Sequence, residues 1–190
     1  MRVLFAGTPE IAVPTLRALA ASSHEVVGVL TAPDRPRGRG RSLAPSPVKE
    51  LALELDLPVL QPERLRADAR AVVTGLEPEL LACFAYGRIF GPKFLALFPR
   101  GAVNVHPSLL PRHRGPAPIP GAILAGDDET GVTIQEVALE MDAGDILAQA
   151  TIPLTGAETS ASLGAAASEV SARLLVETID RLPHGRSIPR

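Results

Sequence analysis

The chain has 190 residues, of which 46% are hydrophobic and 21% charged, and its formal net charge is −2. This composition predicts one folded globular unit and excludes an intrinsically disordered chain. The sequence contains no apolar stretch of the roughly 18 residues needed for a membrane span and no recognisable leader, so we expect a cytoplasmic protein without a membrane partner. The single cysteine, Cys83, excludes an internal disulfide framework and a zinc cage built from thiolates.

The first two thirds of the chain alternate short apolar runs with helical segments. Strands are expected at residues 2–6, 25–31, 58–60, 79–85 and 102–106, and helices at 11–21 and 92–98. Ser46 and Pro47 are typical of an N-cap and a first helical position, and predict a further helix through residue 56. The alternation predicts an α/β fold with a doubly wound, mostly parallel sheet.

The last third has a different pattern. Residues 132–138 and 145–154 read as strands joined by only a few residues, which predicts a C-terminal antiparallel strand pair. From Thr159 onward apolar residues recur at helical spacing as far as the breakers Pro183 and Gly185, which predicts a long closing helix. We therefore expect one domain over residues 1–190.

Two polar residues stand at the end of the strand expected at 102–106. Asn104 and His106 are separated by one residue, so the alternation of a strand places both side chains on the same face. Pro107 then ends the strand at its carboxyl end, where open α/β sheets bind their ligands. An amide and a protonated imidazole together can stabilise an oxyanion. On spacing alone, however, polar residues at a strand end are more often turn-formers or caps than catalysts.

A basic segment lies between Asp34 and Lys49. It carries a net charge of +4 in a protein whose total is −2, and its arginines alternate with proline and glycine. Two interpretations are open for this segment. It is either a solvated surface loop, or a loop whose guanidinium groups contact phosphates and stack on the bases of an RNA.

Several motifs in order along the chain resemble the folate-dependent formyltransferase family. They are the opening FAGTPE, the loop PDRPRGRGRSLAPSPVK, AYG at 85–87, NVHPSLLPRHRGPAP, TGVTIQEV and MDAGDI. The resemblance covers nearly the whole chain and implies a Rossmann-like formyltransferase fold. Within the family, the loop and the order of motifs are most similar to the members that formylate initiator methionyl-tRNA. Those members carry an additional C-terminal β-barrel domain, which we do not expect within residues 1–190.

The resemblance implies roles for particular residues. Asn104, His106 and Asp142 fall on the family's catalytic triad, and Ser108, Leu109, Leu110 and Pro111 on its folate-binding tetrad. The implied reaction transfers a formyl group from 10-formyltetrahydrofolate to an amine. In it Asn104 and His106 hold the developing negative oxygen, while Asp142 keeps the imidazole charged and relays the amine's proton. Without the resemblance, Asp142 in MDAG is read as a turn residue.

The remaining assignments follow from the same comparison. Tyr86 and Gly87 are expected at the cofactor site, the tyrosine either as packing or as a pterin contact through its backbone. Arg39 occupies the family's GRG position, and with Arg41 and Lys49 it is the candidate contact to tRNA. His113 stands where the family commonly has tryptophan. No metal is expected, since the histidines fit no metal-ligand spacing, and no obligatory protein partner is evident.

Other functions remain open at this point. Formyltransferases that act on a ribonucleotide amine or on an amino sugar share the motifs, and a folate or RNA-binding module or a formylfolate hydrolase would share the fold. A glycine-rich phosphate-binding turn after the first strand favours the ribonucleotide enzyme, whereas this chain has GTPEIAVP there.

Overall fold

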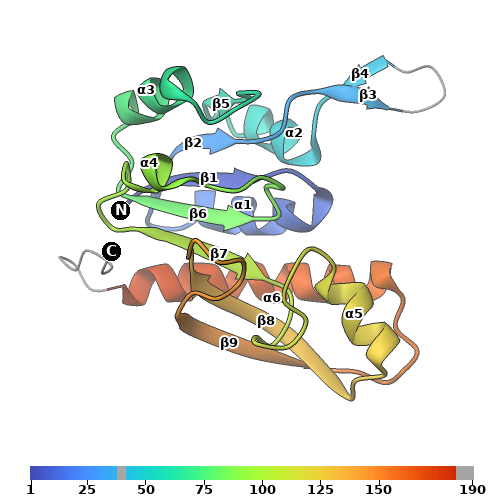
Figure 1. Ribbon diagram of the computed structural model, residues 1–190. Coiled ribbons are helices and arrows are strands. Elements are labelled where there is room, and N and C mark those ends of the chain that lie inside the picture. The colour runs from blue at the N-terminus through green and yellow to red at the C-terminus, as the bar shows by residue number, and fades with distance from the viewer. Residues whose placement is uncertain (38–41, 183–190) are drawn as a thin grey trace.

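The computed structural model describes residues 1–37 and 42–182. Within these residues a seven-stranded sheet has the order β5-β2-β1-β6-β7-β8-β9 (Figure 1). The first five of these are parallel, whereas β8 is antiparallel to β7 and β9 is antiparallel to β8. The strands are β1 Arg2–Gly7, β2 Glu25–Leu30, β5 Val59–Leu60, β6 Leu80–Phe84, β7 Ala102–His106, β8 Glu129–Glu136 and β9 Ile146–Pro153. The expected α/β sheet with an antiparallel C-terminal pair is confirmed.

Helices cover both faces of the parallel strands. Along β1, Val3 and Phe5 belong to one buried apolar cluster and Leu4 and Ala6 to the other, as the alternation of a strand requires. Helix α6 packs on α1 and extends along β8 and β9 (Figure 1). The helices are α1 Val13–Ala20, α2 Pro47–Glu54, α3 Ala67–Gly75, α4 Pro92–Leu95, α5 Pro118–Ala125 and α6 Ser160–Arg181, with a 3-10 turn η1 at Glu10–Ala12.

Local caps account for where two of these helices begin. The Ser46 hydroxyl accepts a hydrogen bond from the Lys49 amide at 3.1 Å, so Ser46 is the N-cap of α2 as expected. Thr159 and Ser162 form a reciprocal capping box at the start of α6. The closing helix expected from residue 159 is therefore confirmed, and it ends at Arg181.

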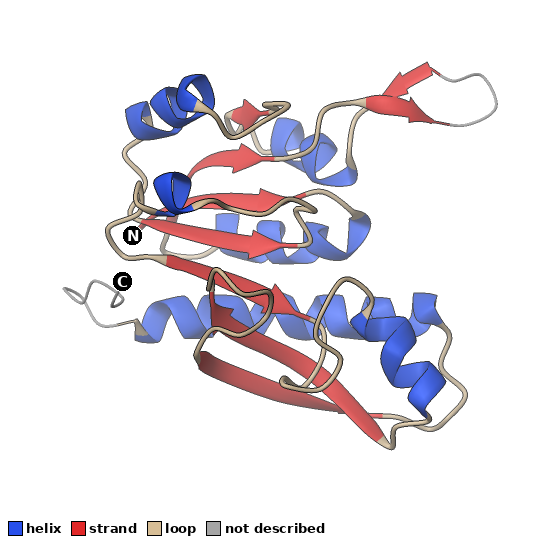
Figure 2. Cartoon of the chain, in the orientation of Figure 1, coloured by secondary structure: helices blue, strands red, loops and turns tan. Residues whose placement is uncertain are grey.

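Some elements differ from the expectations. The helix expected at 92–98 is only the single turn α4, Pro92–Leu95. The proline-rich segment PAPIPG forms the beginning of α5, because proline is tolerated in the first turn of a helix. The basic loop contains a short antiparallel hairpin, β3 Arg35–Arg37 and β4 Ser42–Ala44, which projects from the body of the protein (Figure 2). Within the described part of the chain, no helix has the length and apolarity to cross a membrane.

Candidate active site

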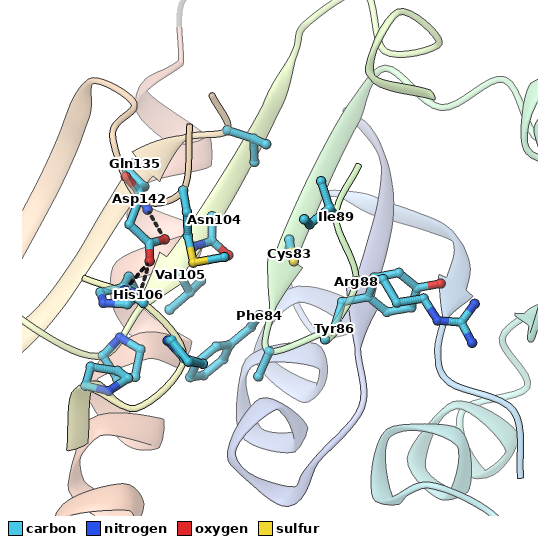
Figure 3. Close-up of a pocket in the computed structure, with 18 of the residues that line it drawn as sticks. Cys83, Phe84, Tyr86, Arg88, Ile89, Asn104, Val105, His106, Gln135 and Asp142 are labelled. Carbon is cyan, nitrogen blue, oxygen red and sulfur yellow. Dashed lines mark hydrogen bonds and ion pairs between the residues drawn. The ribbon is translucent and has the colours of Figure 1, made fainter. Parts of the chain in front are cut away.

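A cavity of about 660 Å³ lies at the carboxyl ends of β6 and β7 (Figure 3). Its walls come from the loop after β6, the end of β7, residues 115–120 and the segment 135–142. Carboxyl ends of strands are where open α/β sheets bind ligands, because the loops that leave the strands there form a crevice. Asn104, His106 and Asp142 all line this cavity.

Asn104 and His106 both project from β7 into the cavity wall. In the β7–β8 pairing Asn104 lies opposite Gln135, and His106 lies opposite Thr133. Residues directly opposite in an antiparallel pair share a face, so a row of polar side chains crosses both strands on the cavity side. The side chain of His106 is almost fully buried, with 5% of the residue exposed. The expectation that Asn104 and His106 share one face agrees with this register.

Asp142 reaches the site from the turn that follows β8. Its Oδ2 lies 3.6 Å from Nδ1 of His106. Asp142 itself has a positive φ of 51°, and Gly144 is required nearby because a Cβ there would overlap the carbonyl oxygen of Glu136. The tight turn, with Gly144 where the chain passes close to Glu136, thus places the Asp142 carboxylate beside the His106 imidazole.

The contact made by Nε2 of His106 shows which ring nitrogen carries a hydrogen when the imidazole is neutral. Nε2 lies 2.9 Å from the backbone carbonyl oxygen of His113. A carbonyl can only accept, so Nε2 must carry a hydrogen and donate it. The proton that makes the ring an imidazolium is therefore bound at Nδ1, the nitrogen that faces Asp142.

The loop that supplies this carbonyl is anchored at Asp127. Nε2 of His113 lies 2.6 Å from Asp127 Oδ2, and the Arg112 guanidinium pairs with Oδ1. The hydrogen bond from His113 is the main reason that the pKa of Asp127 lies below its usual value, and the charge of Arg112 acts in the same direction. His113 thus holds its own loop in place through its hydrogen bond to Asp127.

The tetrad Ser108 to Pro111 does not line the cavity. Ser108 and Leu110 are buried, and Thr133 of β8 donates to the Ser108 carbonyl and accepts from the Leu110 amide, at 2.7 and 3.1 Å. Leu109 lies over Gly131, where a Cβ would meet its side chain. The tetrad is therefore a turn that is hydrogen-bonded to β8. Its contact with folate stays a prediction.

Tyr86 and Gly87 belong to the loop after β6 and line the cavity. The Tyr86 ring stacks on Phe90, with centroids 5.4 Å apart and planes 9° apart, so its ring packs in the core. The backbone of the loop turns through positive φ at Ala85 and Gly87. Nearby Cys83 is no candidate nucleophile, because burial raises the pKa of its thiol to about 12.

The residues expected to contact tRNA are only partly described. Arg39 and Arg41 lie outside the described residues. Lys49 lies at the first turn of α2, and its Nζ is 2.7 Å from Oδ2 of Asp34. Gln61 donates to the other oxygen of Asp34 at 2.7 Å, and these two hydrogen bonds lower the pKa of Asp34. The ion pair of Lys49 therefore holds Asp34, the residue before β3, against the start of α2.

The structure adds residues that the sequence analysis did not single out. Gly115 and Gln135 donate hydrogen bonds to Asp142, and Ile89, Leu139 and Met141 are exposed apolar side chains among the cavity-lining residues. An amide within the apolar run of β8 was the available signal for Gln135. Among residues 1–37 and 42–182, no group of three or more His, Cys, Asp or Glu side chains is arranged to hold a metal ion.

Comparison with known proteins identifies the family of the chain. The Formyl transferase family model matches residues 1–179. Methionyl-tRNA formyltransferase from Treponema pallidum subsp. pallidum is 52% identical over 187 residues, which cover 94% of this chain and 58% of that protein. The enzyme of the same name from Methylobacillus flagellatus is 49% identical over 183 residues, covering 96% and 59%. The chain thus spans about three fifths of the length of these relatives.

Solved structures share the fold. Phosphoribosylglycinamide formyltransferase from Bacillus halodurans superposes with a TM-score of 0.78 at 26% identity, covering 96% of this chain and 95% of that one. Glycinamide ribonucleotide transformylase 1 from Symbiobacterium toebii gives 0.79 at 22% identity, with coverage of 94% and 85%, a likeness in fold alone. Since the family model matches nearly the whole length, this chain belongs to the formyl transferase family.

Proposed function

We propose that the chain is the catalytic part of a cytoplasmic enzyme that transfers a formyl group from 10-formyltetrahydrofolate to the α-amino group of initiator methionyl-tRNA. The observation that carries the proposal is the meeting of Asn104, His106 and Asp142 in one cavity, although they come from a strand and a separate turn. The choice of acceptor is supported by relatives at 52% and 49% identity that are named for methionyl-tRNA.

The cavity has the character that a folate needs. Apolar and backbone surface from the loops at 85–90 and 115–120 can bury a flat ring, and Arg88 lies near the Tyr86 ring on the same wall. The bound folate supplies the formyl group. Ser108 to Pro111 would act by holding the turn from which residues 113 and 115 reach the site.

Asn104, His106 and Asp142 then each have a separate role in the transfer. Asn104 donates from its amide to the oxygen on which negative charge develops, and the His106 imidazolium stabilises the same charge. Asp142 faces Nδ1 of His106, so its carboxylate favours the protonated ring and can accept the proton that the amine gives up. Burial of the pair strengthens both effects, because little water remains to screen them.

A ribonucleotide amine is the alternative acceptor, since two solved structures that share this fold are named for glycinamide ribonucleotide and phosphoribosylglycinamide. The first helical turn after β1 disfavours binding of a ribonucleotide acceptor. Glu10 opens that turn, and a carboxylate repels a phosphate at a helix N-terminus.

The test is a formyl-transfer assay with 10-formyltetrahydrofolate and four acceptors in parallel: methionyl-tRNA, glycinamide ribonucleotide, an amino sugar nucleotide and water. We expect formylmethionyl-tRNA as the main product. Faster formylation of either small amine would contradict the proposed acceptor. Release of formate at the same rate with and without an acceptor would contradict transfer itself.

A further inference from the structure

Gln135 is a buried amide beside the reaction site. It lies on β8 directly opposite Asn104, and only 2% of the residue is exposed. Its Nε2 donates a hydrogen bond to Oδ1 of Asp142 at 2.9 Å, drawn in Figure 3 as the dashed line between Gln135 and Asp142. The residue also lines the cavity.

The hydrogen bonds to Asp142 form a clamp on its carboxylate. Gln135 binds Oδ1, and the Gly115 amide binds Oδ2 at 2.8 Å. The torsion that rotates an aspartate carboxylate is broad, so the rotamer alone does not set the plane of the group. The two donors therefore determine where Oδ2 lies relative to His106, 3.6 Å away.

No described residue donates a hydrogen bond to the other end of the amide. Gln135 Oε1 is buried and accepts no hydrogen bond from any residue in the described ranges. A buried acceptor left unpaired is costly, and such atoms in native proteins usually meet a ligand or water. Oε1 is shielded from solvent in this structure, so the contact that bears on the reaction site is the one made by Nε2.

We propose that Gln135 is a positioning residue for formyl transfer: its Nε2 fixes the Asp142 carboxylate toward His106. The inference rests on the proposed function and deepens it. One side chain would thereby hold the carboxylate that takes up the proton of the amine where it faces the imidazole. The direction of the amide follows from the same contact, because an ionised carboxylate accepts from Nε2 and repels Oε1.

Other titratable groups near Asp142 are accounted for. His106 of β7 faces it directly, and Cys83 of β6 senses its charge but stays protonated because burial raises its pKa to about 12. Glu136, beside Gln135, has a pKa raised by burial and by Asp145. These groups are the same in wild type and in both Gln135 variants below, so a difference between those proteins reports on residue 135.

The first measurement needs no turnover. The His106 ring is titrated by NMR in wild type, Gln135→Glu and Thr130→Val, with the His106 signal assigned from its loss in His106→Asn. Glu at 135 keeps the size of the side chain but replaces the Nε2 donor with a second carboxyl group beside Asp142. Two carboxyl groups this close share a proton, so the titration midpoint of His106 should shift by about one unit. Thr130 is the matched control, because it is buried on the same strand and its hydroxyl has no partner in the described residues. An unmoved midpoint in Gln135→Glu would overturn the proposal.

The second measurement is steady-state transfer by Gln135→Met, which keeps the length of the side chain and removes both hydrogen-bonding ends. We expect kcat to fall roughly 10- to 100-fold, the effect of losing hydrogen bonds to a charged group, with KM for folate unchanged. A kcat within twofold of wild type would overturn the proposal. If wild type prefers another amine, the proposed acceptor is wrong, and the same comparison with that amine still decides the role of Gln135.

Discussion

The imidazole of His106 donates a hydrogen bond to the backbone carbonyl of His113, 2.9 Å away. The ring of His113 in turn lies 2.6 Å from Asp127 Oδ2, and a Cβ at Gly121 would meet that ring. The loop that contains His113 thus connects the surface ion pair between Arg112 and Asp127 to the orientation of the His106 imidazole. The integrity of that loop should matter both for stability and for transfer.

Asp127→Asn tests this connection through its pH dependence. The pKa of Asp127 in the folded protein lies below the ordinary 3.8, because His113 and Arg112 favour the carboxylate. The contribution to stability is therefore present above about pH 4 and is lost as pH falls through the folded pKa. We expect the variant to have a lower Tm than wild type at pH 7, with the difference shrinking toward pH 3. The neighbouring Asp128→Asn is the control, and a Tm difference that does not depend on pH would contradict the explanation.

Asn104→Ala and His106→Ala should each remove most of the transfer activity while the protein stays folded. Loss of one oxyanion donor costs on the order of 100- to 1,000-fold in rate. Single-turnover transfer rates and the far-UV CD spectrum of each variant make the comparison. Near-normal turnover in either variant would mean that its side chain does not act on the developing charge.

Asp142→Asn should be almost as harmful, because an amide carries no charge to favour the imidazolium and cannot take up a proton. The clamp from Gly115 and Gln135 keeps the residue in place in the variant, since an amide oxygen can accept one of these bonds. The measurement is the rate of transfer as a function of pH. A profile with the same shape as that of wild type would refute the electrostatic role.

Replacing Arg39 and Arg41 together by Ala should weaken binding of tRNA and spare binding of folate. Each lost phosphate contact should flatten the dependence of log affinity on log salt by roughly 0.7 to 0.9. The control is Arg173→Ala with Arg181→Ala, which removes the same charge from exposed positions on α6. Equal salt slopes for the Arg39/Arg41 variant and wild type would assign the segment to a solvated surface and favour a small amine as acceptor.

Gly144→Ala should lower transfer more than it lowers stability. The added Cβ would overlap the Glu136 carbonyl oxygen, so the turn must shift and carry Asp142 away from His106. Gly75→Ala in α3 is the control, because a Cβ there meets nothing within 4 Å. We expect at least a tenfold loss of kcat for the first variant and none for the second, since misplacement of about 1 Å can cost on the order of 100-fold in rate. Equal kcat values would show that the turn tolerates the side chain.

Local patterns in the sequence were enough for much of the architecture. Alternation along β1 sends Val3 and Leu4 to opposite faces. Ser46 caps α2 as predicted, and α6 begins directly after Thr159, where the helical spacing of apolar residues begins. These features depend on residues close in the chain, which is why they can be read without the fold. The shared face of Asn104 and His106 is of the same kind, because it needs only the period of one strand.

The completed site depends on contacts between distant segments. The amino-acid sequence by itself determined the strands of the main sheet, helices α1, α2 and α6, the polar pair at the end of β7 and, through its motifs, the family, but not α3 or α5. The resemblance implied that Asp142 acts on His106, and the structure places the two side chains 3.6 Å apart. Only the tertiary structure decided that Gln135 holds Asp142, that Ser108 and Leu110 turn toward β8, and that Lys49 pairs with Asp34. The reason is physical: strand register and tight turns bring side chains together by backbone pairing across the sheet, and no periodicity within one segment encodes which partner lies opposite.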